Sequence, residues 1–234
     1  GSPKPHEITE GWVPDVWRQG GYTSLPEMKG VNVEQEVLWD NVAVNIEREL
    51  PWFTGDLPHK QTAVLVCGGP SLKDSIQAIK DHKRRGARIV TVNNTLTYLL
   101  SQGIVPDFHV MLDARRENVE FIKSAPPGVR YFLASQCHPD VFEALKDRDV
   151  SVWHNAVDGG HVERIAKQRA TAENPVVPVP GGGTVGLRVM FLLYMSGYRK
   201  LHIYGMDGSY TNGQHHAYSQ PLNDGEQILD VVLN

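Results

Sequence analysis

The chain has few cysteines, no excess of charge of one sign and no long run of apolar residues. Its 234 residues include 2 cysteines, Cys67 and Cys137, which cannot form a disulfide framework. Cys67 lies in an apolar strand pattern, so we expect a reducing, cytoplasmic setting. The most apolar stretch, residues 189–195, is far shorter than the ~20 residues of a spanning helix, so we expect no membrane span. A basic-then-apolar signal peptide is also lacking.

The charge balance argues against one class of protein, and the length indicates the number of domains. There are 23 basic and 27 acidic side chains, a net charge of −4, which argues against a nucleic-acid binder held by phosphate neutralisation. Hydrophobic residues make up 41% of the chain, as in ordinary globular proteins. The length fits one large domain with an appendage.

Short apolar runs alternate with amphipathic stretches from Thr62 onward. The predicted strands cover residues 62–67, 88–92, 107–112, 130–134, 150–153 and 201–204, and the predicted helices cover residues 72–85, 96–102, 116–123, 141–146 and 185–195. This alternation, with apolar runs lacking clean two-residue periodicity, predicts an α/β fold: a Rossmann-like, mostly parallel sheet flanked by helices.

The first 60 residues do not show this alternation of strands and helices. Residues 1–30 mix Pro and Gly with Trp12 and Trp17, and predict an irregular arm that either covers the domain or contacts another copy of the chain. Residues 32–51 carry an imperfect helical stripe that includes Val37 and Val44. We therefore divide the chain into an arm and helix (1–60) and a Rossmann-like domain (61–234). An apolar pattern that stops at Asn234 predicts that the natural chain continues.

Two glycine turns are candidate anion sites, because strand, glycine turn and helix N-terminus together present free backbone N–H groups. The first turn contains Gly68, Gly69, Pro70 and Ser71. It is neither a P-loop nor a dinucleotide fingerprint, and a plain strand-to-helix turn remains its alternative. The second turn runs through Gly182, Gly183 and Thr184. Three consecutive glycines are costly in conformational entropy, so we favour ligand contact there over close backbone packing. Two such turns suggest a substrate with several phosphates.

Polar residues follow other predicted strands, where an α/β sheet places its ligand. Asn93 could contact a ribose, base or phosphate, or simply form a turn. Asp113 could bind a metal or a ligand hydroxyl, or cap a helix in a pair with Arg116. Asp207 opens a polar, glycine-rich loop containing His215 and His216, one of which could act as a general base; solvated loop histidines are the alternative.

Four motifs in this order resemble the family of MptE-like 6-hydroxymethylpterin diphosphokinases and flagellar motility accessory factors. They are Gly69-Pro70-Ser71-Leu72, Pro106-Asp107 with Asp113, Gly181-Gly182-Gly183-Thr184-Val185-Gly186, and Gly205-Met206-Asp207. The first turn is also similar to the CMP-binding turn of bacterial sialyltransferases, except that Gly68 stands where those have Asn. Asn93 matches a later Asn of the sialyltransferases.

The resemblance implies a nucleotide-dependent transferase. A glycosyltransferase would use a nucleotide-activated, CMP-nonulosonate-like sugar, with His215 or His216 as base and Mg²⁺ optional. A diphosphokinase would move diphosphate from ATP to a pterin alcohol, with Mg²⁺ on Asp113 and Asp207. A non-catalytic nucleotide-binding protein is the third hypothesis. The expected partners are a nucleotide donor and a small-molecule or protein acceptor.

Overall fold

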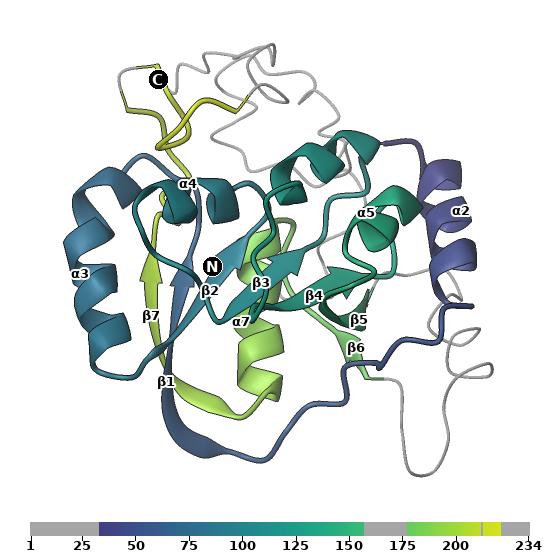
Figure 1. Cartoon of the computed structure of the whole chain (residues 1–234), viewed down its shortest axis with the longest axis horizontal. Helices are drawn as coiled ribbons and strands as arrows, with labels where there is room; N and C mark the ends of the chain where they lie inside the picture. The colour runs from purple at the N-terminus through teal and green to yellow at the C-terminus, as the bar shows by residue number, and fades with distance from the viewer. Residues whose placement is uncertain (1–32, 157–176, 212, 221–234) are drawn as a thin grey trace, which may run out of the picture. The chain divides into compact units, whose positions relative to one another are not determined.

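The computed structural model describes residues 33–156, 177–211 and 213–220, which lie in one compact unit spanning Val31–Asp224. A seven-stranded sheet in the order β6-β5-β4-β3-β2-β1-β7 forms its centre, and every strand pair is parallel. The strands are β1 (His59–Val66), β2 (Arg88–Val92), β3 (Phe108–Met111), β4 (Arg130–Ala134), β5 (Asp149–Asn155), β6 (Pro178–Val179) and β7 (Tyr198–Tyr204). The predicted Rossmann-like α/β class is confirmed (Figure 1).

Helices cover both faces of this sheet. They are α2 (Gln35–Asn45), α3 (Leu72–Arg84), α4 (Thr95–Ser101), the 3₁₀ helix η2 (Arg116–Ile122), α5 (Pro139–Ala144) and α7 (Val185–Met195). Figure 1 shows α3 beside β7 and β1, and α2 at the opposite end of the sheet next to α5. None of the helices described is both long enough and apolar enough to cross a membrane.

The two faces of β1 pack against different helices. Val64 and Val66 belong to one buried cluster with Leu72 and Ile79 of α3 and residues of α4. The alternate residues of β1, such as Leu65, join a second cluster that contains the buried face of α7. Because successive strand residues point to opposite faces, β1 is apolar throughout its second half, as expected of a strand covered on both sides.

The strands differ from the sequence prediction mainly at their amino ends. β1 begins at His59 and β7 at Tyr198, three residues before the predicted starts. Several residues of these opening segments, including Lys60 and Arg199, are exposed and polar, so the apolar pattern marks only part of each strand. β6 has two residues and was not predicted, since so short a run carries no periodicity. The predicted arm (1–30) and the chain end after Gln220 lie outside the described residues.

Helix α2 forms where a helix was predicted, but with a different buried face. Val37 and Val44 of the predicted stripe are 40% and 50% exposed. The buried side chains are instead Asn41, Val42 and Asn45, so the inward face is partly polar. A stripe defined by apolar residues alone missed this face, which lies in the same compact unit as the sheet.

The order of the strands places a topological switch point beside β1. The chain moves from β1 through β2 to β6 in one direction across the sheet, then crosses by α7 to β7 on the other side of β1. In open α/β sheets, ligands bind outside the carboxyl ends of the strands at such a point. The segments that follow β1 and β7 are therefore the place to look for a site.

Candidate functional site

The glycine turn after β1 is held by the segment that follows β7. The Gly69 N–H donates to the Gly205 carbonyl at 2.7 Å, and the Ala217 N–H donates to the Gly68 carbonyl at 2.8 Å. Gly205 has φ +67°, and a Cβ atom there would lie 2.2 Å from the Cys67 carbonyl oxygen. Only glycine therefore permits this approach of the two segments.

Asp207 binds the N-terminus of α3. Its carboxylate accepts the Ser71 N–H at 2.7 Å and the Ser71 hydroxyl at 2.5 Å. A negative charge is favourable at a helix N-terminus, so Asp207 stands where an external anion was expected. The amides of Gly69 and Ser71 are thus both engaged within the protein. Carboxylate oxygens have further acceptor capacity, so Asp207 can still accept a hydrogen bond from a ligand hydroxyl.

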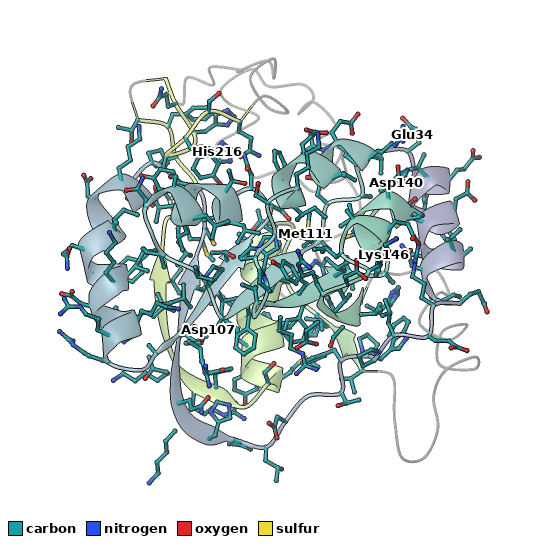
Figure 2. The ribbon with its side chains drawn as sticks, viewed as in Figure 1. Glu34, Asp107, Met111, Asp140, Lys146 and His216 are labelled. Carbon is teal, nitrogen blue, oxygen red and sulfur yellow. The ribbon has the colours of Figure 1, made fainter. Side chains whose placement is uncertain are left out.

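The two predicted histidines have different surroundings, although their ring centroids are 4.8 Å apart. His216 lies against the first glycine turn, where a Cβ on Gly68 would be 3.0 Å from its Cδ2. His215 stacks on Tyr210, with ring centroids 5.1 Å apart. Figure 2 shows His216 near α4, at the rim formed by the carboxyl ends of the strands. Of the two histidines, His216 is therefore the one found against this turn.

Tyr218 is a site residue that the sequence did not single out. Its hydroxyl makes a 3.0 Å hydrogen bond with Thr95, the first residue of α4. A Cβ atom on Gly68 would lie 2.4 Å from the same hydroxyl oxygen. Gly68 is therefore needed for packing against Tyr218, and burial raises the pKa of this tyrosine to about 12, so it remains a neutral hydrogen-bonding group.

The second glycine turn reaches the same rim of the sheet as the first. Gly186, in the first turn of α7, is so close to its neighbours that a Cβ atom would lie 2.9 Å from Cys67 Sγ and 2.8 Å from Met206 Cε. The Thr184 hydroxyl caps α7 by accepting the Leu187 N–H at 3.4 Å. Burial, and then the charge of Asp207, raise the pKa of Cys67 to about 12, so this thiol stays protonated.

The glycines of the second turn differ in how much space surrounds the position of a Cβ atom. A Cβ on Gly182 would lie 2.5 Å from Leu187 Cδ1, so close packing explains this glycine without a ligand. Gly183 has no atom near its missing Cβ and is exposed. The open surface is therefore at Gly183 and Thr184, at the positive end of the α7 dipole.

Asn93 and Asp113 both form hydrogen bonds or ion pairs within the protein. Asn93 has φ +42°, its N–H donates to the Val110 carbonyl at 3.1 Å, and its side-chain oxygen is 3.5 Å from the Leu112 N–H. Asp113 pairs with Arg115, whose Nη2 is 2.5 Å from Oδ2. The sequence had suggested Arg116 as the partner of Asp113, but Arg116 pairs with Asp140.

A magnesium ion shared by Asp113 and Asp207 does not fit this arrangement. Asp113 follows β3 and Asp207 follows β7, which are three strands apart, or roughly 14 Å at the usual strand spacing. Each carboxylate already accepts hydrogen bonds from protein donors. Within the described part of the chain, no group of three or more His, Cys, Asp and Glu side chains could hold a metal ion.

Two asparagines of α2 support the loops that follow β3 and β4. The Asn41 amide donates to the Ala114 and Gln136 carbonyls at 3.3 and 3.0 Å. The Asn45 amide donates to the Ser135 and Cys137 carbonyls at 2.9 and 2.7 Å. The only sequence signal for this clamp is a pair of Asn residues four positions apart on one helix face.

Comparison with known proteins identifies the family and supports the fold of this chain. The sequence matches the family model described as "6-hydroxymethylpterin diphosphokinase MptE-like" over residues 37–213. A search of curated protein sequences gave no match.

Among solved structures, the MAf glycosyltransferase from Magnetospirillum magneticum AMB-1 is similar, with a TM-score of 0.62 and 20% identity over 86% of this chain. The chain spans only 31% of the length of that glycosyltransferase, so the likeness shows the fold. A mammalian sialyltransferase is more distant, with a TM-score of 0.41 and 11% identity over 84% of this chain and 81% of that one. Because the family model covers well over half of the sequence, this chain belongs to the MptE-like family and has a glycosyltransferase-like fold.

Proposed function

We propose that this chain is a transferase that uses a nucleotide-activated sugar of the CMP-nonulosonate kind. The observation that carries the proposal is the convergence of three chemical groups at the β1–β7 switch point. The Gly68 turn, the Asp207 carboxylate and the His216 ring meet there, and the exposed N-terminus of α7 lies on the same rim.

We assign the binding roles of these groups by whether their hydrogen-bonding atoms are already used within the protein. The donor's phosphate would bind at Gly183 and Thr184 and beside Gly68, where the turn faces the loop after β7. The amides of Gly69 and Ser71, with Pro70 between them, would support the phosphate indirectly by holding Asp207. Asp207 would then orient a ribose or sugar hydroxyl, and Asn93 with Asp113 would border the nucleotide through their own turns.

His216 would supply the base in this scheme. The acceptor hydroxyl would give its proton to the imidazole as its oxygen forms a bond to the anomeric carbon, and the nucleotide would leave with the electron pair of the broken glycosidic bond. Histidine is the side chain that most often serves as a general base. The acceptor itself would be a small molecule or a protein.

The description of the matched family favours a second candidate, a pterin diphosphokinase. Such an enzyme would transfer diphosphate from ATP to the pterin alcohol and release AMP, with Mg²⁺ held by carboxylates. The separation of Asp113 from Asp207 gives this candidate less support than the first.

One set of assays separates the candidates. The chain is incubated with CMP-N-acetylneuraminate, and CMP release is measured, while a parallel sample receives ATP, Mg²⁺ and 6-hydroxymethylpterin for AMP release. Thermal shifts with CMP, CDP, UDP and ATP accompany both. We expect a cytidine nucleotide to raise Tm and CMP to be released. AMP release would replace our proposal by the second candidate, and a nucleotide-induced shift without turnover would indicate a non-catalytic binding protein.

A further inference from the structure

Arg188, in α7, is a partly buried arginine. Its Nη1 atom is buried and has no hydrogen-bond partner. Within the residues that the structure describes, no carboxylate forms an ion pair with it. A covered cationic nitrogen without an acceptor loses the hydrogen bonds that water would supply, which is unfavourable. Such groups are rare in folded proteins and call for an explanation.

The comparison with other arginines of similar burial makes Arg188 stand out. Arg48 and Arg115 are also partly buried, and each has a carboxylate partner. Arg48 pairs with Glu143 at 2.6 Å, and Arg115 pairs with Asp113 at 2.5 Å. In both of these cases a described carboxylate is the partner of the half-buried guanidinium. Arg188 is the exception among these three.

The position of Arg188 is close to the second glycine turn. It lies in the second turn of α7, and its N–H donates to the Thr184 carbonyl at 3.2 Å. Gly181 folds back onto it, because a Cβ atom on Gly181 would lie 2.9 Å from the Arg188 Cα and 3.0 Å from its Cγ. Gly181 also has φ +146°, a backbone conformation that residues other than glycine rarely adopt. The glycine thus makes room for the stem of Arg188.

The direction of the helix brings this side chain toward the proposed site. Side chains on a helix lean toward its N-terminus, and the N-terminus of α7 is at the carboxyl-end rim, since Gly186 packs against Cys67 and Met206. The exposed Gly183 and Thr184 lie at the same helix end. A cation and the positive end of a helix dipole without a described acid between them form a field that attracts an anion.

We propose that Arg188 binds an anionic group of the donor, a phosphate or a sugar carboxylate. The guanidinium presents a planar pair of N–H donors that matches either anion in a bidentate way. The identity of the ligand rests on the proposed function. The choice of Arg188 as the residue that binds it rests on the buried Nη1 atom, which has no described acceptor.

The test uses the full chain with Arg188→Met, which removes the charge at similar length, and Arg188→Lys, which retains the charge without the planar donors. Arg84→Met is the matched control, because Arg84 is an exposed helix arginine paired with Asp81 at the far end of α3. Calorimetric titrations use CMP, cytidine, free N-acetylneuraminate and inorganic pyrophosphate. The melting temperature of each unliganded variant is measured in parallel.

We expect Arg188→Met to weaken binding of the anion by about 10-fold or more, and Arg188→Lys to weaken it less. Weaker binding of CMP with unchanged cytidine binding assigns the phosphate, and weaker binding of the free sugar acid assigns the carboxylate. The unliganded Met variant should melt at a higher temperature than wild type, since it no longer buries an unpaired charge. A purely structural arginine would give the opposite sign, a lower melting temperature with unchanged affinity.

The result that overturns the inference is wild-type affinity of Arg188→Met for every anion, or no binding of any probe by the wild type. This failure can be told apart from failure of the proposed function. If the wild type binds CMP and releases it from the sugar nucleotide while Arg188→Met binds equally well, only the inference falls. If pyrophosphate binding depends on Arg188 but no sugar nucleotide is cleaved, only the proposed function falls.

Discussion

Asp207 accepts two hydrogen bonds from Ser71, one from its backbone N–H and one from its hydroxyl, across 136 positions of sequence. The contact joins the turn after β7 to Ser71, the residue just before α3, and adds a carboxylate at the N-terminus of that helix. It also decides which amides at the rim are left for a ligand. The stability of the rim and the geometry of the proposed donor site therefore depend on one carboxylate.

Replacing Asp207 by Ala should lower the free energy of unfolding by about 1–3 kcal/mol, because Ser71 loses both acceptors and α3 loses its favourable charge. Ser71→Ala should cost less, since the backbone N–H remains bound. Urea unfolding with a constant m-value measures both changes. Asp74→Ala is the control, an exposed acid in the first turn of the same helix. Equal stabilities of the Asp207 and Asp74 variants would contradict the capping role.

The packing of Gly68 against Tyr218 can be measured by a double-mutant cycle. Gly68→Ala places a Cβ 2.4 Å from the Tyr218 hydroxyl oxygen and 3.2 Å from the ring carbon that carries it. We expect a loss of roughly 1–3 kcal/mol of stability from this overpacking. Tyr218→Phe removes the nearest atom, so the double variant should be more stable than the sum of the single effects predicts. Strict additivity would show that the two residues are not in contact.

The two loop histidines should differ in their effect on rate. His216→Ala should lower the rate of sugar transfer by about 10²–10⁴ if His216 is the base, because it is the ring against the first glycine turn. His215→Ala should have a smaller effect, since its ring stacks on Tyr210. Steady-state kcat and KM are compared for both variants. A larger loss of kcat at His215 than at His216 would reverse the assignment.

His109 should make the protein less stable in mild acid. Burial lowers its pKa to about 3, so the folded state keeps the ring neutral, whereas the unfolded chain protonates it near 6.5. The unfolded state thus binds the proton more tightly, and this contribution to stability is complete above pH 6.5 and lost progressively as pH falls toward 3. At pH 5 the loss is about 2 kcal/mol.

The variant His109→Phe isolates that contribution. Urea unfolding of wild type and variant at pH 7 and pH 5 should show a smaller pH effect in the variant. Other titrating groups are common to both proteins and cancel in the difference. The interpretation fails if wild type and variant lose the same stability between the two pH values. His59→Phe, a partly exposed histidine at the start of β1, serves as the matched control.

The fold could be inferred from the sequence because its signals are local. An apolar strand such as β2, a glycine turn such as Gly68-Gly69 and the Thr184 cap are each written in a few consecutive residues. Repetition of strand and helix then implies a parallel sheet, and a parallel sheet gathers its strand ends at one rim. The rim that holds Gly68, Gly186 and Asp207 was predictable for that reason.

The pairing of polar groups that are far apart in the chain depends on the tertiary structure. The sequence alone determined the α/β class and the segments that form the rim. The sequence did not show that Asp207 binds Ser71 or that Asp113 pairs with Arg115 rather than Arg116. Nor did it show that Arg188 Nη1 has no acceptor among the described residues. A hydrogen bond depends on distances within a few tenths of an ångström between residues far apart in the chain, and such distances exist only once the sheet has set its strands side by side.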